Sequence, residues 1–274
     1  MTSHPRTHGQ PEHARTYLMC PPDYFAVKYA INPWMNPALP VDLARAQRQW
    51  EQLKATYLAL GHTVRIIDAQ PDLPDMVFAA NGGTVIGGGV LGSKFKHPER
   101  QPEAAVYMNW FRQSGYQVTV PVHVNEGEGD IIFARRAIIA GYGLRSDEAV
   151  GGEAAALSGL PVISVRLVDP RFYHLDTALI VLDENTAAYY PAAFDEAGQA
   201  ALAAHFGELI EAKDADAEVL GLNGISDGRN VVLPVQAEGL ARDIHAAGFT
   251  VVPVDMSEFK KAGGGPKCCT LELR

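Results

Sequence analysis

The chain has 274 residues, 47% of them hydrophobic and 20% charged, and its formal net charge is −9 at pH 7. This composition is typical of a globular protein, and the acidic balance argues against nucleic acid or an anionic membrane as the main partner. No apolar run reaches the ~18 residues of a membrane span, and Met1 to Arg15 lack the apolar core of a signal peptide. We therefore expect a soluble, cytoplasmic protein with a disordered tail over residues 1–16, one domain over residues 17–274 and three reduced cysteines.

The clearest predicted helix runs from Asp42 to Leu60, because apolar residues recur along it at steps of three and four. Asp42 can cap its start and Gly61 can end it. A short apolar strand follows over residues 62–67, and a second strand starts at residues 76–78. This stretch therefore reads as one helix–strand unit.

The same order of helix, glycine and strand returns four more times. Helices are predicted over residues 103–114, 147–158 (with Ser146 as cap), 195–206 and 236–247. Between the predicted helices over residues 42–60 and 103–114, Gly87 to Gly89 predict a hairpin, because no helix opens after them as a dinucleotide-binding turn requires. The five helix-ending glycines lie 41 to 54 residues apart, which indicates a repeat architecture: Gly61, Gly115, Gly159, Gly207 and Gly248.

A polar residue follows each of these glycines 15 to 23 residues later, near the start of a second strand. These residues are Asn81, Asp130, Asp176, Asn230 and Cys268. If five units pack around one axis, equivalent positions face a common centre, where residues 75–81, 126–130, 174–176 and 227–230 would meet Cys268. The alternative is an ordinary open α/β sheet with accidental spacing.

The C-terminal stretch carries the strongest chemical signal. Three glycines and Pro266 lead directly into Cys268 and Cys269, and an alternation of polar and apolar residues follows. Glycines let the backbone approach another group closely, so a cysteine on such a turn can be held rigidly while its sulfur stays reachable. The alternative is an edge strand with two half-buried cysteines, and Cys269 is expected to pack on the opposite face.

The converging residues combine one thiol, Cys268, with one histidine, His174, which is the minimum for covalent catalysis with proton transfer. Several carboxylates around a thiol would raise its pKa and discourage attack, unless the substrate is itself a cation. A guanidinium group resolves this conflict, because carboxylates bind its N–H edges in pairs and its central carbon is electrophilic. The carboxylates are Asp75, Glu126, Glu128, Asp130 and Asp176.

Four motifs in order resemble the guanidine-modifying (amidinotransferase) superfamily, and most of all its bacterial dimethylarginine dimethylaminohydrolases. The resemblance covers residues 17–274 and implies a five-bladed α/β propeller, or pentein, of repeated ββαβ units with pseudo-fivefold symmetry. It implies no metal and no cofactor, and a homodimer is a further expectation. The motifs are Leu-Pro-Asp-Met-Val-Phe-Ala-Ala-Asn at 73–81, Glu-Gly-Glu-Gly-Asp at 126–130, Phe-Tyr-His-Leu-Asp-Thr at 172–177 and Gly-Gly-Gly-Pro-Lys-Cys-Cys-Thr at 263–270, together with the opening residues 19–25 and 31–35.

The resemblance implies a role for each matching residue. Cys268 resembles the nucleophile, His174 the general acid and base, and Glu126 the carboxylate that orients this histidine. Asp75 resembles the residue that holds the substrate α-amino group. The remaining substrate-binding residues would be Arg100 and Arg145 at the α-carboxylate, and Asn81, Asp176 and Glu128 at the guanidinium.

Three features depart from the pattern of the dimethylarginine hydrolases. Asn81 stands where relatives carry an aspartate, and the run from Glu126 to Asp130 is one residue longer than usual. Glu126 and Glu128 are therefore both candidates for orienting His174, with Glu126 favoured if a bulge absorbs the extra residue. Asp176 resembles a carboxylate of deiminases and amidinotransferases.

The implied reaction is hydrolysis of Nω,Nω-dimethyl-L-arginine, or Nω-methylarginine, to citrulline and an amine through a covalent cysteine thiouronium. The partner is then a small cationic guanidino amino acid. An arginine deiminase or a citrulline- or ornithine-related enzyme of the same superfamily is the first alternative. A non-catalytic five-bladed binding module is the second, and it would be expected to lack the cysteine–histidine pair.

Overall fold

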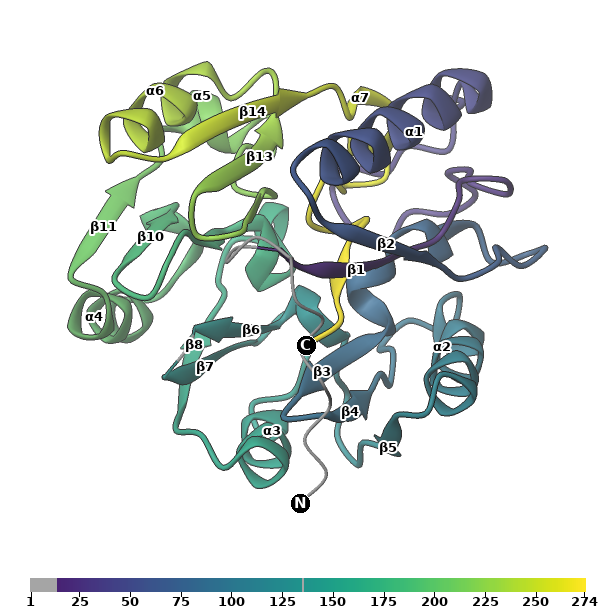
Figure 1. The fold of residues 1–274 in the computed structure, drawn as a ribbon, viewed down its shortest axis with the longest axis horizontal. Coiled ribbons are helices and arrows are strands. Elements are labelled where there is room, and N and C mark those ends of the chain that lie inside the picture. The colour runs from purple at the N-terminus through teal and green to yellow at the C-terminus, as the bar shows by residue number, and fades with distance from the viewer. Residues whose placement is uncertain (1–13, 135) are drawn as a thin grey trace.

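A computed structural model describes residues 14–134 and 136–274, in which the strands form five sheets of three strands each. The five sheets surround a common centre, and the longer helices lie on the outside (Figure 1). The predicted five-bladed α/β propeller is thereby confirmed. Of the predicted tail, residues 1–13 lie outside the described residues, and Thr16 already belongs to the first strand.

Each blade repeats one ββαβ pattern: two antiparallel strands, a helix, and a third strand parallel to the second. The second blade contains β3 (Gly83–Ile86), β4 (Gly89–Gly92), α2 (Gln101–Gln113) and β5 (Gln117–Thr119). The third contains β6 (Ile131–Ala134), β7 (Ala137–Tyr142), α3 (Val150–Ser158) and β8 (Val162–Arg166). The fourth contains β9 (Leu179–Val181), β10 (Thr186–Tyr189), α4 (Glu196–His205) and β11 (Glu208–Glu211). The fifth contains β12 (Ile225–Ser226), β13 (Asn230–Pro234), α6 (Glu238–Ala246) and β14 (Thr250–Val254).

The first blade joins the two ends of the described chain. It contains β1 (Thr16–Met19), α1 (Leu43–Ala59), β2 (Thr63–Ile66) and the C-terminal strand β15 (Leu271–Glu272). Strand β15 is antiparallel to β1, with Tyr17 opposite Glu272, and β1 is parallel to β2. The ring therefore closes only when the end of the chain pairs with its beginning. Two short helices, α5 (Asp214–Ala217) and α7 (Ser257–Lys260), complete the fifth blade and its connection to the first.

Most of the predicted helix boundaries are confirmed. Asp42 caps α1 by accepting a hydrogen bond from Arg45 N, and four of the five predicted glycines follow their helices with positive φ angles of 70° to 99°. The fifth, Gly207, follows an extended Phe206, so its predicted cap is wrong. The predicted hairpin is present, since β3 and β4 are antiparallel and joined at Gly87 and Gly88.

One predicted cap is replaced by another role. Helix α3 begins at Val150, so Ser146 lies before it and does not cap it. The Ser146 hydroxyl instead donates to Asp130 Oδ2 at 2.7 Å and accepts from Glu126 N at 3.1 Å. This serine therefore stabilises the polar segment in front of β6.

The hydrophobic core lies between the sheets and their outer helices. Trp50, Leu53 and Tyr57 on α1, for example, are 3% exposed or less and pack in a cluster that includes both Cys268 and Cys269. Each large apolar side chain buried in this way contributes about 1.5–3 kcal/mol. The apolar contacts that stabilise the fold lie between the sheets and the helices. The residues at the axis can therefore be polar. The predicted packing role of Cys269, which is fully buried, is confirmed.

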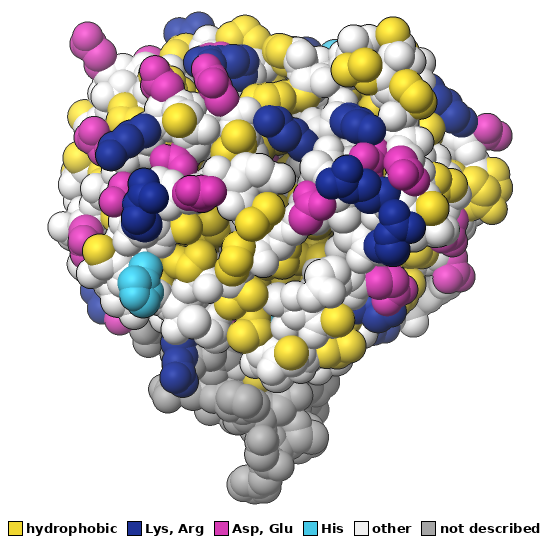
Figure 2. All heavy atoms as spheres, turned by 90° about the horizontal axis from the view of Figure 1, so that it is seen from above, with side chains coloured by type: hydrophobic (Ala, Val, Ile, Leu, Met, Phe, Trp, Pro, Cys, Tyr) yellow, Lys and Arg dark blue, Asp and Glu magenta, His cyan; other side chains and the backbone are white. Residues whose placement is uncertain are grey.

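The outer surface mixes charges of both signs. On the face in Figure 2, the described basic and acidic side chains lie interspersed with apolar and uncharged ones. Within residues 14–134 and 136–274, no helix is both long enough and apolar enough to cross a membrane.

Candidate active site

Several candidate site residues lie in short segments directly before the first strand of a blade. Asn81 lies in the 3-10 helix Ala79–Gly82 before β3, and Asp176 in the 3-10 helix Leu175–Thr177 before β9. Glu126 precedes the 3-10 helix Gly127–Gly129 and β6, and Cys268 stands three residues before β15. Equivalent positions of four blades therefore meet at the axis, as the repeat predicts.

The fifth contribution differs from the prediction. Asn230 lies in β13, where its amide donates to Asp227 Oδ2 at 2.8 Å. Asn223, two residues before β12, reaches the axis in its place. Asn230 follows Gly207 by 23 residues, which is the longest of the five spacings. Asn223 follows Gly207 by 16 residues, inside the 15–20 range of the other four, so this signal could have found it.

Hydrogen bonds join neighbouring segments all the way round the axis. The donors and acceptors come from consecutive blades, which holds the converging side chains at fixed distances. The bonds are Ala80 N to Cys268 O at 3.0 Å, Asn81 Nδ2 to Glu126 O at 3.0 Å, Glu126 Oε2 with His174 Nε2 at 2.7 Å, Asn223 Nδ2 to Asp176 O at 3.0 Å, and Cys268 N to Asn223 Oδ1 at 3.0 Å.

Cys268 is 2% exposed, and its sulfur contacts two polar side chains. Asn223 Nδ2 donates to Sγ at 3.1 Å, and Asp176 Oδ2 lies 3.5 Å from Sγ. Burial, together with the nearby Asp176, raises the pKa of the Cys268 thiol well above its usual value. The sulfur is therefore a neutral thiol near neutral pH.

Glu126 is the glutamate that contacts His174. Burial alone would raise the pKa of Glu126, but Arg145 at 2.8 Å and the hydrogen bond from His174 outweigh burial and hold this pKa well below its usual range. An ionised carboxylate only accepts hydrogen bonds, so His174 Nε2 must carry a proton. His174 Nδ1 is then the atom available for proton transfer, and it has no hydrogen-bond partner among the described residues.

The second glutamate, Glu128, points to another part of the molecule. Its carboxylate binds Lys267 Nζ at 2.7 Å, Arg274 Nη1 at 2.6 Å and the backbone N of Glu272 at 3.1 Å. The expectation that Glu128 contacts a guanidinium beside His174 is therefore corrected. Gly127, at a positive φ of 61°, turns the backbone between the two glutamates so that their side chains diverge.

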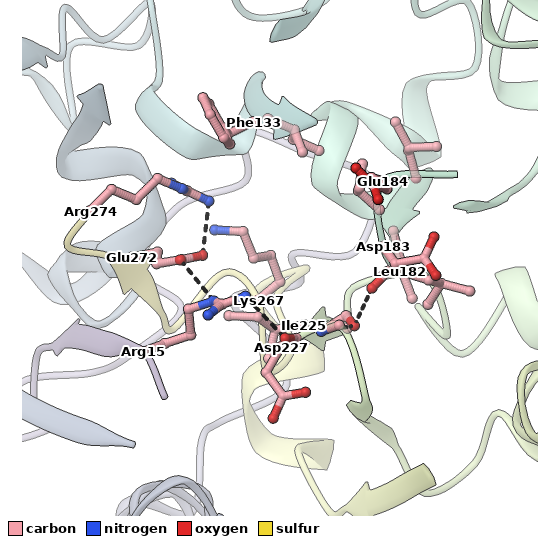
Figure 3. A pocket seen from close by; sticks show the side chains of 17 residues that line it. Arg15, Phe133, Leu182, Asp183, Glu184, Ile225, Asp227, Lys267, Glu272 and Arg274 are labelled. Carbon is pink, nitrogen blue, oxygen red and sulfur yellow. Dashed lines mark hydrogen bonds and ion pairs between the residues drawn. The ribbon is translucent and has the colours of Figure 1, made fainter. Parts of the chain in front are cut away.

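A cavity of about 600 Å³ lies beside the residues that bind Glu128. Lys267 and Arg274, the two basic partners of Glu128, line this cavity together with Glu272 and Arg15 (Figure 3). Glu272 bridges Arg274 and Arg15, at 2.8 and 3.3 Å. This cluster ties the C-terminal strand to the rest of the ring.

Asp75 and Arg100 are placed together in the second blade. Asp75 Oδ2 accepts a hydrogen bond from Tyr29 at 2.9 Å, whereas Asp75 Oδ1 has no partner among the described residues. Arg100 donates to both carboxylate oxygens of Glu103, to Asn81 Oδ1 at 2.8 Å and to the Asp75 carbonyl. Burial raises the pKa of Asp75 even though Arg100 and Tyr29 act in the opposite direction.

Arg145 connects the site to the loop above it. Its Nη2 donates to the carbonyl of Ile31 at 2.9 Å, and its guanidinium stacks on the ring of Tyr173 at 4.6 Å from the ring centre. Tyr29 and Ile31 both belong to the irregular segment between β1 and α1, over residues 20–42. This segment therefore contacts both Asp75 and Arg145, and the site side chains beneath it are at most 4% exposed.

Several residues of the site were not predicted from the sequence. Tyr29 lies in a loop without periodicity. Glu103 lies in the first turn of α2, where an acidic side chain is usually solvated. Ser146 was assigned to a helix cap. Only Asn223 had a sequence signal, through its spacing from Gly207.

Proteins similar to this chain point to one family. A profile described as "N,N dimethylarginine dimethylhydrolase, eukaryotic" matches residues 30–274. The N(G),N(G)-dimethylarginine dimethylaminohydrolase of Mycobacterium tuberculosis is 53% identical over 259 residues, which cover 94% of this chain and 86% of that protein. The chain belongs to the dimethylarginine dimethylaminohydrolase family. It is thus a hydrolase of the family that acts on guanidino carbon–nitrogen bonds, as the motifs implied.

Other relatives of this chain are named for a different activity. The bifunctional arginine dihydrolase/ornithine cyclodeaminase AgrE of Nostoc sp. is 36% identical over 264 residues, or 94% of this chain but 37% of that longer protein. The N-terminal domain of ArgZ, solved with a covalently bound reaction intermediate, superimposes with a TM-score of 0.90 at 35% identity, covering 95% of this chain and 98% of that one. A solved dimethylarginine dimethylaminohydrolase with a TM-score of 0.79 and 18% identity supports the fold.

Proposed function

We propose that this enzyme hydrolyses Nω-methylated L-arginine, including Nω,Nω-dimethyl-L-arginine, to citrulline and the corresponding methylamine. The geometry of the site supports a guanidino amino acid as the substrate class. The methylated form is suggested by the Mycobacterium tuberculosis relative, a dimethylarginine dimethylaminohydrolase that is 53% identical.

Two orphaned polar atoms carry the proposal. Of the five buried side-chain nitrogen or oxygen atoms without a partner among the described residues, two are Asp75 Oδ1 and His174 Nδ1. A buried polar atom without a partner costs about 1–3 kcal/mol, so it needs an explanation such as a missing ligand. A guanidino amino acid between them would supply an ammonium group to Asp75 and a leaving nitrogen to His174.

The reaction would proceed in two steps. As the cationic substrate binds, the Cys268 thiol gives its proton to His174 Nδ1, and the thiolate attacks the guanidinium carbon and forms a C–S bond. The C–N bond to the methylated nitrogen then breaks, and His174 Nδ1 delivers the proton that the departing amine needs. His174 next takes a proton from water, which adds to the same carbon. Cleavage of the C–S bond releases citrulline and restores Cys268.

The amino-acid end would be held by the cluster around Asp75. The Asp75 carboxylate would bind the substrate ammonium in place of Tyr29, and Arg145 would turn toward the α-carboxylate. Arg100 is assigned to the same carboxylate. It also positions Asn81, because it donates hydrogen bonds to both Glu103 and Asn81. Asn81 and Asp176 would flank the guanidinium.

Unmethylated arginine is the second candidate, and Asp176 favours it. A dimethylated nitrogen has no N–H to donate, whereas the terminal NH₂ of arginine can donate to a carboxylate. The Asp176 carboxylate lies 3.5 Å from Cys268 Sγ, so it would face the groups on the attacked carbon. The relative AgrE, which is named as an arginine dihydrolase, is consistent with this second candidate.

The deciding experiment identifies the amine that is released. Purified enzyme is incubated separately with dimethylarginine, methylarginine, arginine, agmatine and citrulline, and dimethylamine, methylamine and ammonia are quantified. Release of dimethylamine from dimethylarginine, with a kcat/KM at least tenfold above that for arginine, supports the proposal. Ammonia from arginine with the higher kcat/KM would replace it by the second candidate.

A variant separates binding from chemistry. Cys268→Ser should abolish turnover and leave substrate binding, measured by calorimetry, within a few-fold of wild type, because the hydroxyl fills the space of the thiol. Full turnover by this variant would contradict the covalent route.

A further inference from the structure

Asn223 occupies the fifth-blade position at the axis, fully buried between the segments that carry Asp176 and Cys268. Three hydrogen bonds connect its side chain to these two neighbours. Its backbone carbonyl also accepts from Lys267 N at 3.2 Å. This one residue therefore contacts Cys268, the residue before it and the neighbouring segment that carries Asp176.

The orientation of the Asn223 amide is fixed by its backbone partners. Oδ1 faces the N–H of Cys268 at 3.0 Å, which can only donate. Nδ2 faces the carbonyl of Asp176 at 3.0 Å, which can only accept. The amide cannot be reversed without breaking both bonds, so the group 3.1 Å from Cys268 Sγ is a hydrogen-bond donor.

We propose that Asn223 is a catalytic residue that donates a hydrogen bond to the Cys268 sulfur and thereby stabilises its thiolate and fixes its direction of attack. The inference deepens the proposed function, because it concerns the same nucleophile. It names a residue that acts on the reacting atom before any substrate is bound.

The charges around the sulfur explain why a neutral donor suits this position. The titratable groups that face Cys268 are Asp176 on the opposite segment, Tyr173 beside His174, and the adjacent Cys269, with Lys267 near Asp176. Asp176 opposes formation of the thiolate through its own negative charge. A basic side chain in place of Asn223 would favour the thiolate but repel a guanidinium, whereas an amide stabilises the sulfur without competing with the substrate.

The test measures the thiol without using any substrate. Iodoacetamide, a neutral alkylating agent, reacts with the thiolate, and peptide mass mapping reports the rate at Cys268 separately from Cys20 and Cys269. The pH midpoint of this rate is compared among wild type, Asn223→Ala, Asn223→Asp and a control, Asn185→Ala, in the exposed turn between β9 and β10. Circular dichroism verifies that each variant is folded.

Loss of a hydrogen bond to a charged sulfur should raise the pH midpoint by about one unit or more in Asn223→Ala. Asn223→Asp keeps an acceptor for Cys268 N but replaces the donor by a negative charge, so its midpoint should rise further, and an unchanged midpoint there overturns the proposal even if Asn223→Ala does not fold. The control should keep the wild-type midpoint. An unchanged midpoint in a folded Asn223 variant would overturn the proposal. Because no substrate is used, this result stands whichever arginine derivative the enzyme hydrolyses.

Discussion

At the scale of single residues, the raised pKa of Asp176 makes the stability of the protein depend on pH. Burial raises its pKa to about 7, so near neutral pH the carboxyl is divided between its neutral and charged forms. A cationic guanidinium beside it would favour the charged form. In the free enzyme, the same carboxylate opposes folding whenever it is ionised, since the unfolded chain solvates it.

Asp176→Asn should therefore stabilise the free enzyme as the pH rises. Between about pH 4 and 7 the folded state binds more protons at this group than the unfolded state, so wild type loses stability as pH rises through that window. The free energy of unfolding of the variant relative to wild type should increase across the window, by up to about 4 kcal/mol for a shift of three pKa units. Urea unfolding at several pH values measures it, and a difference that does not change with pH would contradict it.

Gly129 keeps two site residues in place by having no side chain. A Cβ atom at this position would lie 2.4 Å from Asn81 Nδ2 and 3.2 Å from the ring of His174. Gly152, in α3, has open space around it and serves as a control.

Gly129→Ala should lower kcat/KM by at least tenfold and the free energy of unfolding by about 1–3 kcal/mol, because the methyl group displaces Asn81 and His174. Gly152→Ala should leave activity unchanged and raise stability by about 0.5–1 kcal/mol, since alanine favours a helix. Steady-state kinetics and urea unfolding measure both variants. Equal activity of the two would contradict the assigned packing.

At the scale of elements, the segment over residues 20–42 covers the site. Tyr29 donates to Asp75, and the Ile31 carbonyl accepts from Arg145. Substrate at Asp75 and Arg145 would have to replace both bonds. Opening of this segment is therefore part of substrate entry in the proposed function.

Tyr29→Phe should make this opening easier. Loss of one hydrogen bond, about 1 kcal/mol, corresponds to roughly a fivefold increase in the open population. Amide hydrogen exchange in the peptide that covers residues 24–36 should accelerate by that factor, while exchange in the strands stays unchanged. Identical exchange in the variant and wild type would show that Tyr29 does not hold the segment.

At the scale of the whole molecule, the ring is closed by its last residues. Strand β15 pairs with β1, and Glu128 from the third blade binds Lys267, Arg274 and the backbone of Glu272. Burial opposes ionisation of Glu128, but Lys267 and Arg274 outweigh it and lower its pKa. The glutamate that the sequence offered as a ligand for substrate thus stabilises the ring.

Glu128→Gln should lower the free energy of unfolding by about 3 kcal/mol, because it leaves its basic partners without their buried counter-charge. Glu51→Gln, at an exposed ion pair with Lys54, should change it by less than about 1 kcal/mol. Glu126→Gln should instead lower kcat by about 100-fold or more, since it disturbs His174. A larger loss of kcat from Glu128→Gln than from Glu126→Gln would reverse the assignment of the two residues.

The repeat was readable from the sequence because helix ends and hairpin turns depend on local chemistry. Asp42 and Gly61 mark α1 by themselves, and Gly87 with Gly88 marks a hairpin. The predicted helix cap at Gly207 was wrong because a glycine can also be required by close packing against a neighbouring side chain. A Cβ there would lie 2.3 Å from the Asn185 side chain.

Site residues could be predicted from the sequence where the side chain has unusual chemistry. They could not be predicted where the role of the side chain depends only on tertiary contacts. Cys268, His174 and Glu126 were found as a thiol, an imidazole and a carboxylate in phase with the repeat. Asn223 is an ordinary amide until the fold brings it to the sulfur, and Tyr29 lies in a loop that no periodicity describes. The divergence of Glu126 and Glu128 depends on the backbone turn at Gly127.

Trapping the covalent intermediate tests the central claim most directly. Wild-type enzyme is mixed with dimethylarginine, quenched in acid during turnover and digested, and the peptide that contains Cys268 is examined by mass spectrometry. We predict an amidino adduct on Cys268 that forms before citrulline, disappears after the substrate is consumed and is absent from Cys268→Ser. Citrulline formation with no adduct on Cys268, and at an undiminished rate in Cys268→Ser, would contradict the account.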